Sequence, residues 1–190
     1  NDPRTGEILE THINWYHNVM SLLRDWYMIQ AGTIDEAARK MQFDDELMGQ
    51  LIRFVSSHEV GHTLGLRHNF GSSHTVPVEK LRDKAWVEAN GHTPSIMDYA
   101  RFNYVAQPED SITRAGIFPR IGIYDKWSIE WGYRWLPQFQ KPEDEIALDQ
   151  IASAIMLADM PLGRVGLGQP CILRHIKRWI RYRPVSYTHL

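Results

Sequence analysis

Apolar residues recur at steps of three and four between residues 44 and 65, which is the spacing of one face of an α-helix. This stripe, which two histidines continue, consists of Leu47, Leu51, Phe54, Val55, His58 and His62. Asp44 and Asp45 stand at its start, where carboxylates interact favourably with the helix dipole. We therefore predict a long helix that is anchored by its apolar face and gives both histidines a rigid support.

Weaker signals predict the remaining elements. Thr33 and Glu36 have the spacing of a capping box, which predicts the start of a short helix. Gly91 is expected to end a further helix, because glycine tolerates the backbone that closes a helix. The predicted elements are a strand in residues 7–13, helices in 14–30, 33–40, 77–90, 124–135 and 144–158, and a mostly irregular stretch in 101–123.

Composition narrows the classes of protein to consider. The 190 residues suffice for one domain of ordinary size, and a hydrophobic content of 43% allows a real core. The net charge of −2 and the lack of a basic stripe with interleaved aromatics argue against nucleic acid as a partner. No apolar run approaches the length of a membrane span, and the single cysteine, Cys171, excludes an internal disulfide.

Residues 58–68 read HEVGHTLGLRH and carry the candidate chemistry. His58 and His62 are one helical turn apart, so both imidazoles can hold one metal ion. Glu59 can reach a metal-bound water and take its proton. Gly65 tolerates the left-handed backbone that ends a helix, so that the chain can return His68 as a third ligand. Three protein ligands leave one position open, which is typical of catalytic zinc. The alternative is a helix with surface or core histidines.

The segment resembles the long zinc signature of the metzincin clan of metallopeptidases. A second stretch, Ser95-Ile96-Met97-Asp98-Tyr99, is similar to the Met-turn of that clan. The resemblance implies an α+β, zincin-like catalytic domain, mostly helical here, with an active-site helix, a Met-turn and a C-terminal helix. It also implies that Met97 forms an apolar floor beneath the three histidines, and that Tyr99 ligates the metal or stabilises the oxyanion. The alternatives are a methionine that fills the core and a tyrosine that only packs.

Three further stretches, in residues 2–8, 15–20 and 124–127, are similar to large bacterial secreted metalloproteases of a Met-zincin type. We expect a partial catalytic domain in residues 1–158, with its upper sheet incomplete and no signal peptide in this sequence. The resemblance implies a location outside the cytoplasm. It also makes the strand in residues 7–13 either an edge strand that pairs with substrate or an ordinary internal strand. Residues 101–123 are expected to line the primed side of the cleft.

Residues 159–190 form an uncertain tail, because the composition changes after about residue 161. The last six residues, VSYTHL, resemble a translated sequencing adaptor, which would be non-native. The alternative is a basic tail that docks on an acidic partner.

The function expected from these features is that of a zinc-dependent endopeptidase acting on a peptide or protein substrate. One zinc ion held by His58, His62 and His68 would activate water, with Glu59 as the general base. A catalytically inactive zinc-binding module of the same fold is the first alternative, and a zinc hydrolase acting on a non-peptide bond is the second. No oligomeric state is predicted.

Overall fold

The structure is a computed structural model that describes residue 3 and residues 8–133, and every structural statement below refers to these residues. The predicted helix in residues 144–158 and the tail in residues 159–190 lie outside them. The described residues form helices and connecting segments, without a strand. The mostly helical character expected of this part of the chain is therefore confirmed, whereas the sheet of the expected α+β fold has no counterpart there.

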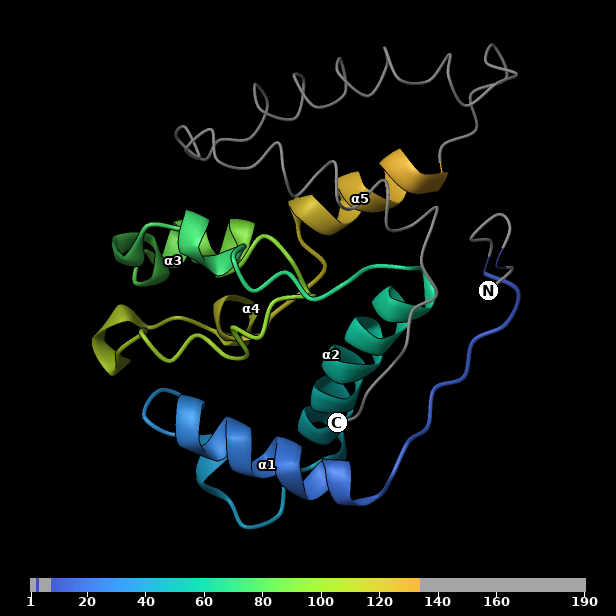
Figure 1. Cartoon of the computed structure of the whole chain (residues 1–190). Coiled ribbons are helices and arrows are strands. Elements are labelled where there is room, and N and C mark those ends of the chain that lie inside the picture. The colour runs from blue at the N-terminus through green and yellow to red at the C-terminus, as the bar shows by residue number, and fades with distance from the viewer. Residues whose placement is uncertain (1–2, 4–7, 134–190) are drawn as a thin grey trace.

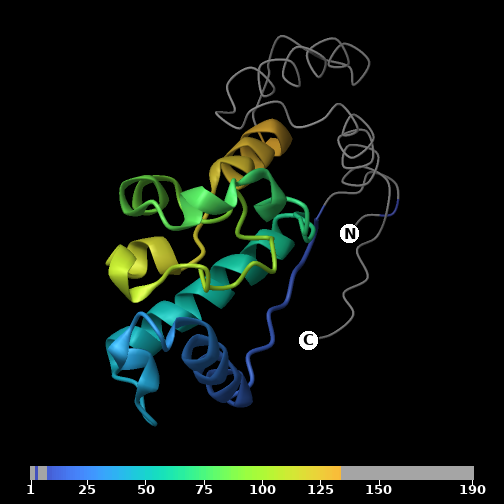
Figure 2. The ribbon, with the colours of Figure 1, turned by 90° about the vertical axis from the view of Figure 1, so that its left-hand side faces the viewer.

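The helices follow one another along the chain, and the longest connection between them is residues 91–107 (Figures 1 and 2). Helix α1 crosses the N-terminal end of α2, and α5 lies toward the opposite end of α2 (Figure 1). The elements are α1 (Asn18–Ala31), η1 (Glu36–Arg39), α2 (Asp45–Thr63), η2 (Ser73–Thr75), η3 (Val78–Leu81), α3 (Lys84–Asn90), η4 (Pro108–Asp110), α4 (Arg114–Ile117) and α5 (Ile123–Tyr133), where η denotes a 3₁₀ helix.

Helix α2 confirms the long helix predicted from the apolar stripe. The carboxylate of Asp44 accepts a hydrogen bond from the Leu47 amide at 2.8 Å, and thereby caps the first turn. Leu47 and Leu51 are fully buried, and His58 lies on the buried side of the same helix. The helix ends at Thr63, slightly before the predicted end at residue 65.

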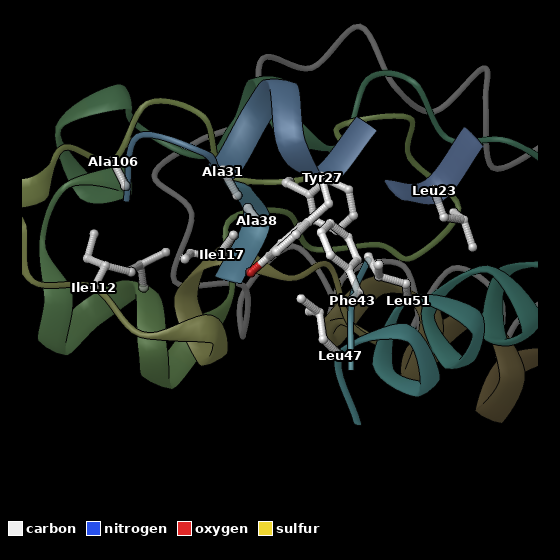
Figure 3. Close-up of a cluster of buried hydrophobic side chains, with 12 residues drawn as sticks. Leu23, Tyr27, Ala31, Ala38, Phe43, Leu47, Leu51, Ala106, Ile112 and Ile117 are labelled. Carbon is white, nitrogen blue, oxygen red and sulfur yellow. The ribbon is translucent and has the colours of Figure 1, made fainter. Parts of the chain in front are cut away.

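The core lies between α1, α2 and residues 102–118. Tyr27 of α1 is fully buried and meets Phe43, Phe102 and Phe118, with ring centroids 6.0, 4.9 and 5.1 Å from its own. Figure 3 shows Tyr27 among the apolar side chains of the cluster, with Leu47 of α2 nearby. This packing fixes the N-terminal half of α2, because aromatic contacts of this kind each contribute about 0.5–1.5 kcal/mol beyond burial.

The buried face of α1 matches the apolar pattern of the sequence in part. The sequence places Trp15, Val19, Leu22, Leu23 and Trp26 on one side. The structure buries Leu23 and packs Val19 and Trp26 against the core, but it leaves Leu22 42% exposed and buries Tyr27 and Ala31 instead. The helix also begins at Asn18 rather than residue 14. Tyr27 can be fully buried on this face because its hydroxyl donates a hydrogen bond to the Asp35 carboxylate at 2.6 Å.

The predicted strand in residues 7–13 is wrong for residues 8–13, which are largely exposed and lie in no regular element. The described residues contain no strand with which this segment could pair, so its backbone groups have no ladder to join. The segment still approaches the turn at the end of α2, because the Ile8 side chain lies about 3.6 Å from a Cβ built on Gly65.

Two other predicted helices differ from the structure in part. Asp35, not Thr33, caps η1, because its carboxylate accepts from the Ala37 amide at 2.9 Å and is held by Arg114 at 2.8 Å. The helix predicted in residues 77–90 is divided into η3 and α3, because the Asp83 carboxylate caps a new start by accepting from the Trp86 amide. Gly91 ends α3 at a φ of 82°, as predicted.

Candidate metal centre

The end of α2 is shaped by a closing turn that needs a glycine. The Leu66 amide donates to the Gly61 carbonyl at 3.0 Å, and the Gly65 amide donates to the His62 carbonyl at 2.9 Å. This pair of bonds is the Schellman motif, which requires a left-handed residue after the helix. Gly65 is the left-handed residue of this turn, with a φ of 88°. The chain leaves the helix in a direction that returns His68 to its end.

The three predicted histidines converge. Ring centroids are 4.8 Å apart for His58 and His62, 5.2 Å for His58 and His68, and 4.7 Å for His62 and His68. One ring nitrogen from each residue can be chosen so that all three lie within 4.8 Å of one another. The Nε2 atoms of His62 and His68 are 3.0 Å apart. A tetrahedral ion with bonds of about 2.0–2.1 Å needs donors about 3.3 Å apart, so the cluster fits a single zinc-sized ion after small adjustments.

Backbone carbonyls fix the tautomers of two of these histidines. The Nδ1 atom of His58 lies 2.8 Å from the Ile96 carbonyl, and Nδ1 of His62 lies 2.8 Å from the Leu66 carbonyl. A carbonyl can only accept, so each Nδ1 carries the proton and each Nε2 keeps its lone pair. This is the arrangement in which an imidazole ligates a metal through Nε2.

Burial also favours neutral imidazoles in the cluster. Desolvation lowers the pKa of His58, and desolvation together with the neighbouring His62 and His58 lowers the pKa of His68 to about 4. His68 is nevertheless the most exposed of the three residues, so the cluster opens to solvent on its side. Neutral imidazoles near pH 7 are the form that binds metal.

A tight turn at residues 95–98 closes the far side of the cluster. Met97 is 1% exposed, and a Cβ added to Gly61 would overlap its sulfur. The glycine between the two helix histidines thus lets the methionine pack directly against α2. The Asn69 amide donates to the Met97 carbonyl at 2.8 Å, which ties the turn to the loop that follows His68.

Two buried aspartates hold this turn. Both lie in stretches that resemble metzincins, but the sequence assigned a role to neither. The Asp98 carboxylate accepts from the Ser72 hydroxyl at 2.7 Å and the Ser73 amide at 2.6 Å, which joins the turn to the loop after His68. Asp125 of α5 is 2% exposed and accepts from the Ser95 hydroxyl and the Ile96 amide, both at 2.6 Å. Burial raises the pKa of Asp125, against the opposing effect of these hydrogen bonds.

A sequence signal for Asp125 exists in retrospect. It is the third residue of α5, and it accepts from the Gly122 amide at 2.8 Å just before the helix. This is one half of a capping box, which a residue at that position can make from local sequence alone. Its second task, at the turn of residues 95–98, depends on a contact about thirty residues away along the chain and could not be read locally.

Tyr99 and Phe70 form an open aromatic wall beside the histidines. The Tyr99 ring lies 4.5 Å from His68 and 5.7 Å from His58, and the Phe70 ring lies 5.1 Å from Tyr99. Tyr99 is 43% exposed and Phe70 is 62% exposed. Desolvation and then the charge of Glu59 raise the pKa of Tyr99, so its hydroxyl stays protonated. The charge of Glu59 also acts on His58, where it opposes the lowering of the pKa by desolvation.

A cavity of about 510 Å³ opens between α2 and residues 114–121. The wall of this cavity includes Ser57, which precedes His58 in the sequence, and Ile96, whose carbonyl accepts the hydrogen bond from His58. Much of the rest of the wall comes from residues 101–123, which are expected from the sequence to line the primed side of the cleft. These lining residues include Arg114 and Arg120.

A helix with two histidines one turn apart, and a third returned by a glycine turn, defines a metzincin-like zinc-binding module. The comparison with protein families agrees: a family model described as Met-zincin matches residues 40–158, and the chain belongs to this family. Searches of the curated proteins and of the solved structures gave no match. None of the helices in the described residues is both long and apolar enough to cross a membrane.

Proposed function

We propose that the protein is a zinc-dependent endopeptidase that hydrolyses peptide bonds. The observation that carries this proposal is the convergence of His58, His62 and His68, with Glu59 one residue after the first of them. Membership of the Met-zincin family supports the same chemistry. We also propose that the catalytic domain ends near residue 158, where the family match ends.

Each residue of the site has a task in this proposal. His58, His62 and His68 would hold the ion, the first two through Nε2. When bound, zinc supplies Lewis acidity, which makes a coordinated water a nucleophile near neutral pH. Glu59 accepts a proton from the attacking water and delivers it to the leaving amine.

Tyr99 and Met97 complete the site. The Tyr99 hydroxyl, kept protonated by its raised pKa, donates a hydrogen bond to the developing oxyanion of the substrate. Met97 acts as the Met-turn residue, because its side chain packs beneath α2 against Gly61 and supports the helix that carries the first two ligands.

The test combines metal content with peptide cleavage in the full chain. We expect about one zinc per wild-type chain and chelator-sensitive cleavage of a peptide library. Glu59→Ala should keep the zinc and lose most turnover, because about 10²–10⁴-fold of the rate depends on the positioned base. His62→Ala should lose the zinc. Cleavage that persists in pure Glu59→Ala protein would contradict the role of Glu59.

The inactive zinc-binding module predicts a different result. In that case the wild-type chain binds zinc through the same three histidines, and no peptide in the library is cut. A hydrolase acting on non-peptide bonds predicts zinc binding and chelator-sensitive turnover of amide or ester compounds other than peptides.

A further inference from the structure

One peptide unit of the turn connects a buried carboxylate to the first histidine. The Ser95 hydroxyl donates to Asp125 Oδ1 at 2.6 Å and accepts from the Met97 amide at 3.1 Å. The carbonyl of that same peptide unit, Ile96 O, accepts from His58 Nδ1 at 2.8 Å. The hydrogen bonds therefore run in one direction, from the imidazole through the peptide and the hydroxyl to the carboxylate.

The relay is closed to solvent along its length. Ser95 is fully buried, Asp125 is 2% exposed and His58 is 7% exposed. The second carboxylate oxygen, Oδ2, accepts from the Ile96 and Gly122 amides at 2.6 and 2.8 Å, which fixes the plane of the carboxylate. Two amide donors on one oxygen also require an acceptor there rather than a protonated hydroxyl.

Such a chain strengthens each of its members. A carboxylate that accepts from the Ser95 hydroxyl makes that oxygen a better acceptor for the Met97 amide, which in turn polarises the Ile96 carbonyl. A more polarised carbonyl pulls harder on the Nδ1 proton of His58 and increases the electron density at its Nε2. In metal sites a carboxylate that contacts the histidine directly has this effect; here a hydroxyl and a peptide stand between the two.

We propose that Asp125 and Ser95 are positioning residues that fix the tautomer of His58 and strengthen it as a zinc ligand. This inference rests on the proposed zinc site. It singles out His58 among the ligands. His62 is instead held by the Leu66 carbonyl, within the turn that ends its own helix.

The test uses the full chain with Ser95→Ala and Asp125→Asn. The matched control is Ser128→Ala, which removes a hydroxyl of similar burial from α5, where it bonds Tyr124 and takes no part in the relay. Zinc affinity is measured by competition with a chelator, and the visible spectrum is recorded with Co²⁺ in place of zinc. Urea unfolding of the metal-free proteins shows how much fold stability each variant loses.

We expect the two relay variants to bind zinc about 10–100-fold more weakly and to shift the Co²⁺ spectrum, with the control within about twofold of wild type. Unchanged affinity and spectrum in both relay variants, or an equal loss in Ser128→Ala, overturns the relay and leaves the zinc site intact. A wild-type chain that binds no zinc refutes the proposed function, and the relay with it.

A second measurement needs no variant. In the zinc-loaded wild type, a long-range ¹H–¹⁵N spectrum should show His58 protonated at Nδ1 and bound through Nε2. The reverse assignment would overturn the relay even if both substitutions prevent folding.

Discussion

Two glycines of the zinc-binding helix and its end should respond in opposite directions to the same substitution. Gly65 has a φ of 88°, whereas Gly49 lies within α2, and a Cβ added there would meet nothing within 4 Å. Alanine at position 65 must adopt a left-handed backbone, which costs about 1–2 kcal/mol. The lower entropy of the unfolded chain returns about 0.4–1 kcal/mol. A net loss of about 1 kcal/mol is therefore expected for Gly65→Ala.

Gly49→Ala has no such cost and should stabilise the helix by about 0.5–1 kcal/mol. The assay is urea unfolding of the full chain in excess chelator, followed by circular dichroism, with zinc affinity measured separately. The free energies of unfolding of the two variants should differ by about 1.5–2 kcal/mol. Only Gly65→Ala should weaken zinc binding, because that turn sets the position of His68. Shifts of equal sign, or zinc affinity lost in Gly49→Ala, would refute this interpretation of the helix end.

Three further predictions concern the aromatic wall, a buried histidine and the packing under the helix. Phe70→Ala should lower kcat/KM about tenfold for peptides with a large apolar side chain beside the scissile bond and little for those with alanine there. Tyr104→Ala, equally exposed but outside the ring cluster, is the control, and an equal effect of both would contradict the prediction. Burial lowers the pKa of His92 to about 4, so between pH 6.5 and 4 the unfolded chain takes up a proton that the folded chain does not. Stability should therefore fall as the pH drops through this window, and urea midpoints of His92→Gln should fall less steeply. Gly61→Ala should cost about 1–3 kcal/mol in the free energy of unfolding, because the added methyl must displace the buried Met97 side chain; a midpoint equal to wild type would show that the methionine moves freely.

The parts of the site that the sequence predicted are those set by short spacings. His58 and His62 share a face because they are four residues apart on a helix whose apolar stripe is regular, and Gly65 ends that helix at a position that only local geometry decides. The third histidine follows because a Schellman turn has one direction of exit. All of these relations lie within eleven residues, so a periodicity argument is sufficient to find them.

The parts that the sequence did not predict depend on partners far along the chain. Asp35 caps η1 in place of Thr33 because Tyr27 and Arg114 both bind its carboxylate, and Arg114 lies well downstream. Asp98 and Asp125 lie in stretches that resemble metzincins, but nothing in the sequence gives either carboxylate a partner. Their roles emerge only when the fold buries them beside hydroxyl and amide donors.

The two buried aspartates also explain why the metal cluster can be rigid although two of its three supporting segments are loops. Asp98 joins the turn to the loop after His68, and Asp125 joins the same turn to α5. The turn itself bonds His58 on α2 through the Ile96 carbonyl. Each carboxylate accepts at least two hydrogen bonds in a buried place, where an unmade bond costs about 1–3 kcal/mol. Any movement of the turn relative to α2 or to the loop after His68 would break several such bonds at once, so buried hydrogen bonds hold His58 and the loop that carries His68 in place. His62 is held separately, by the Leu66 carbonyl at the end of its own helix.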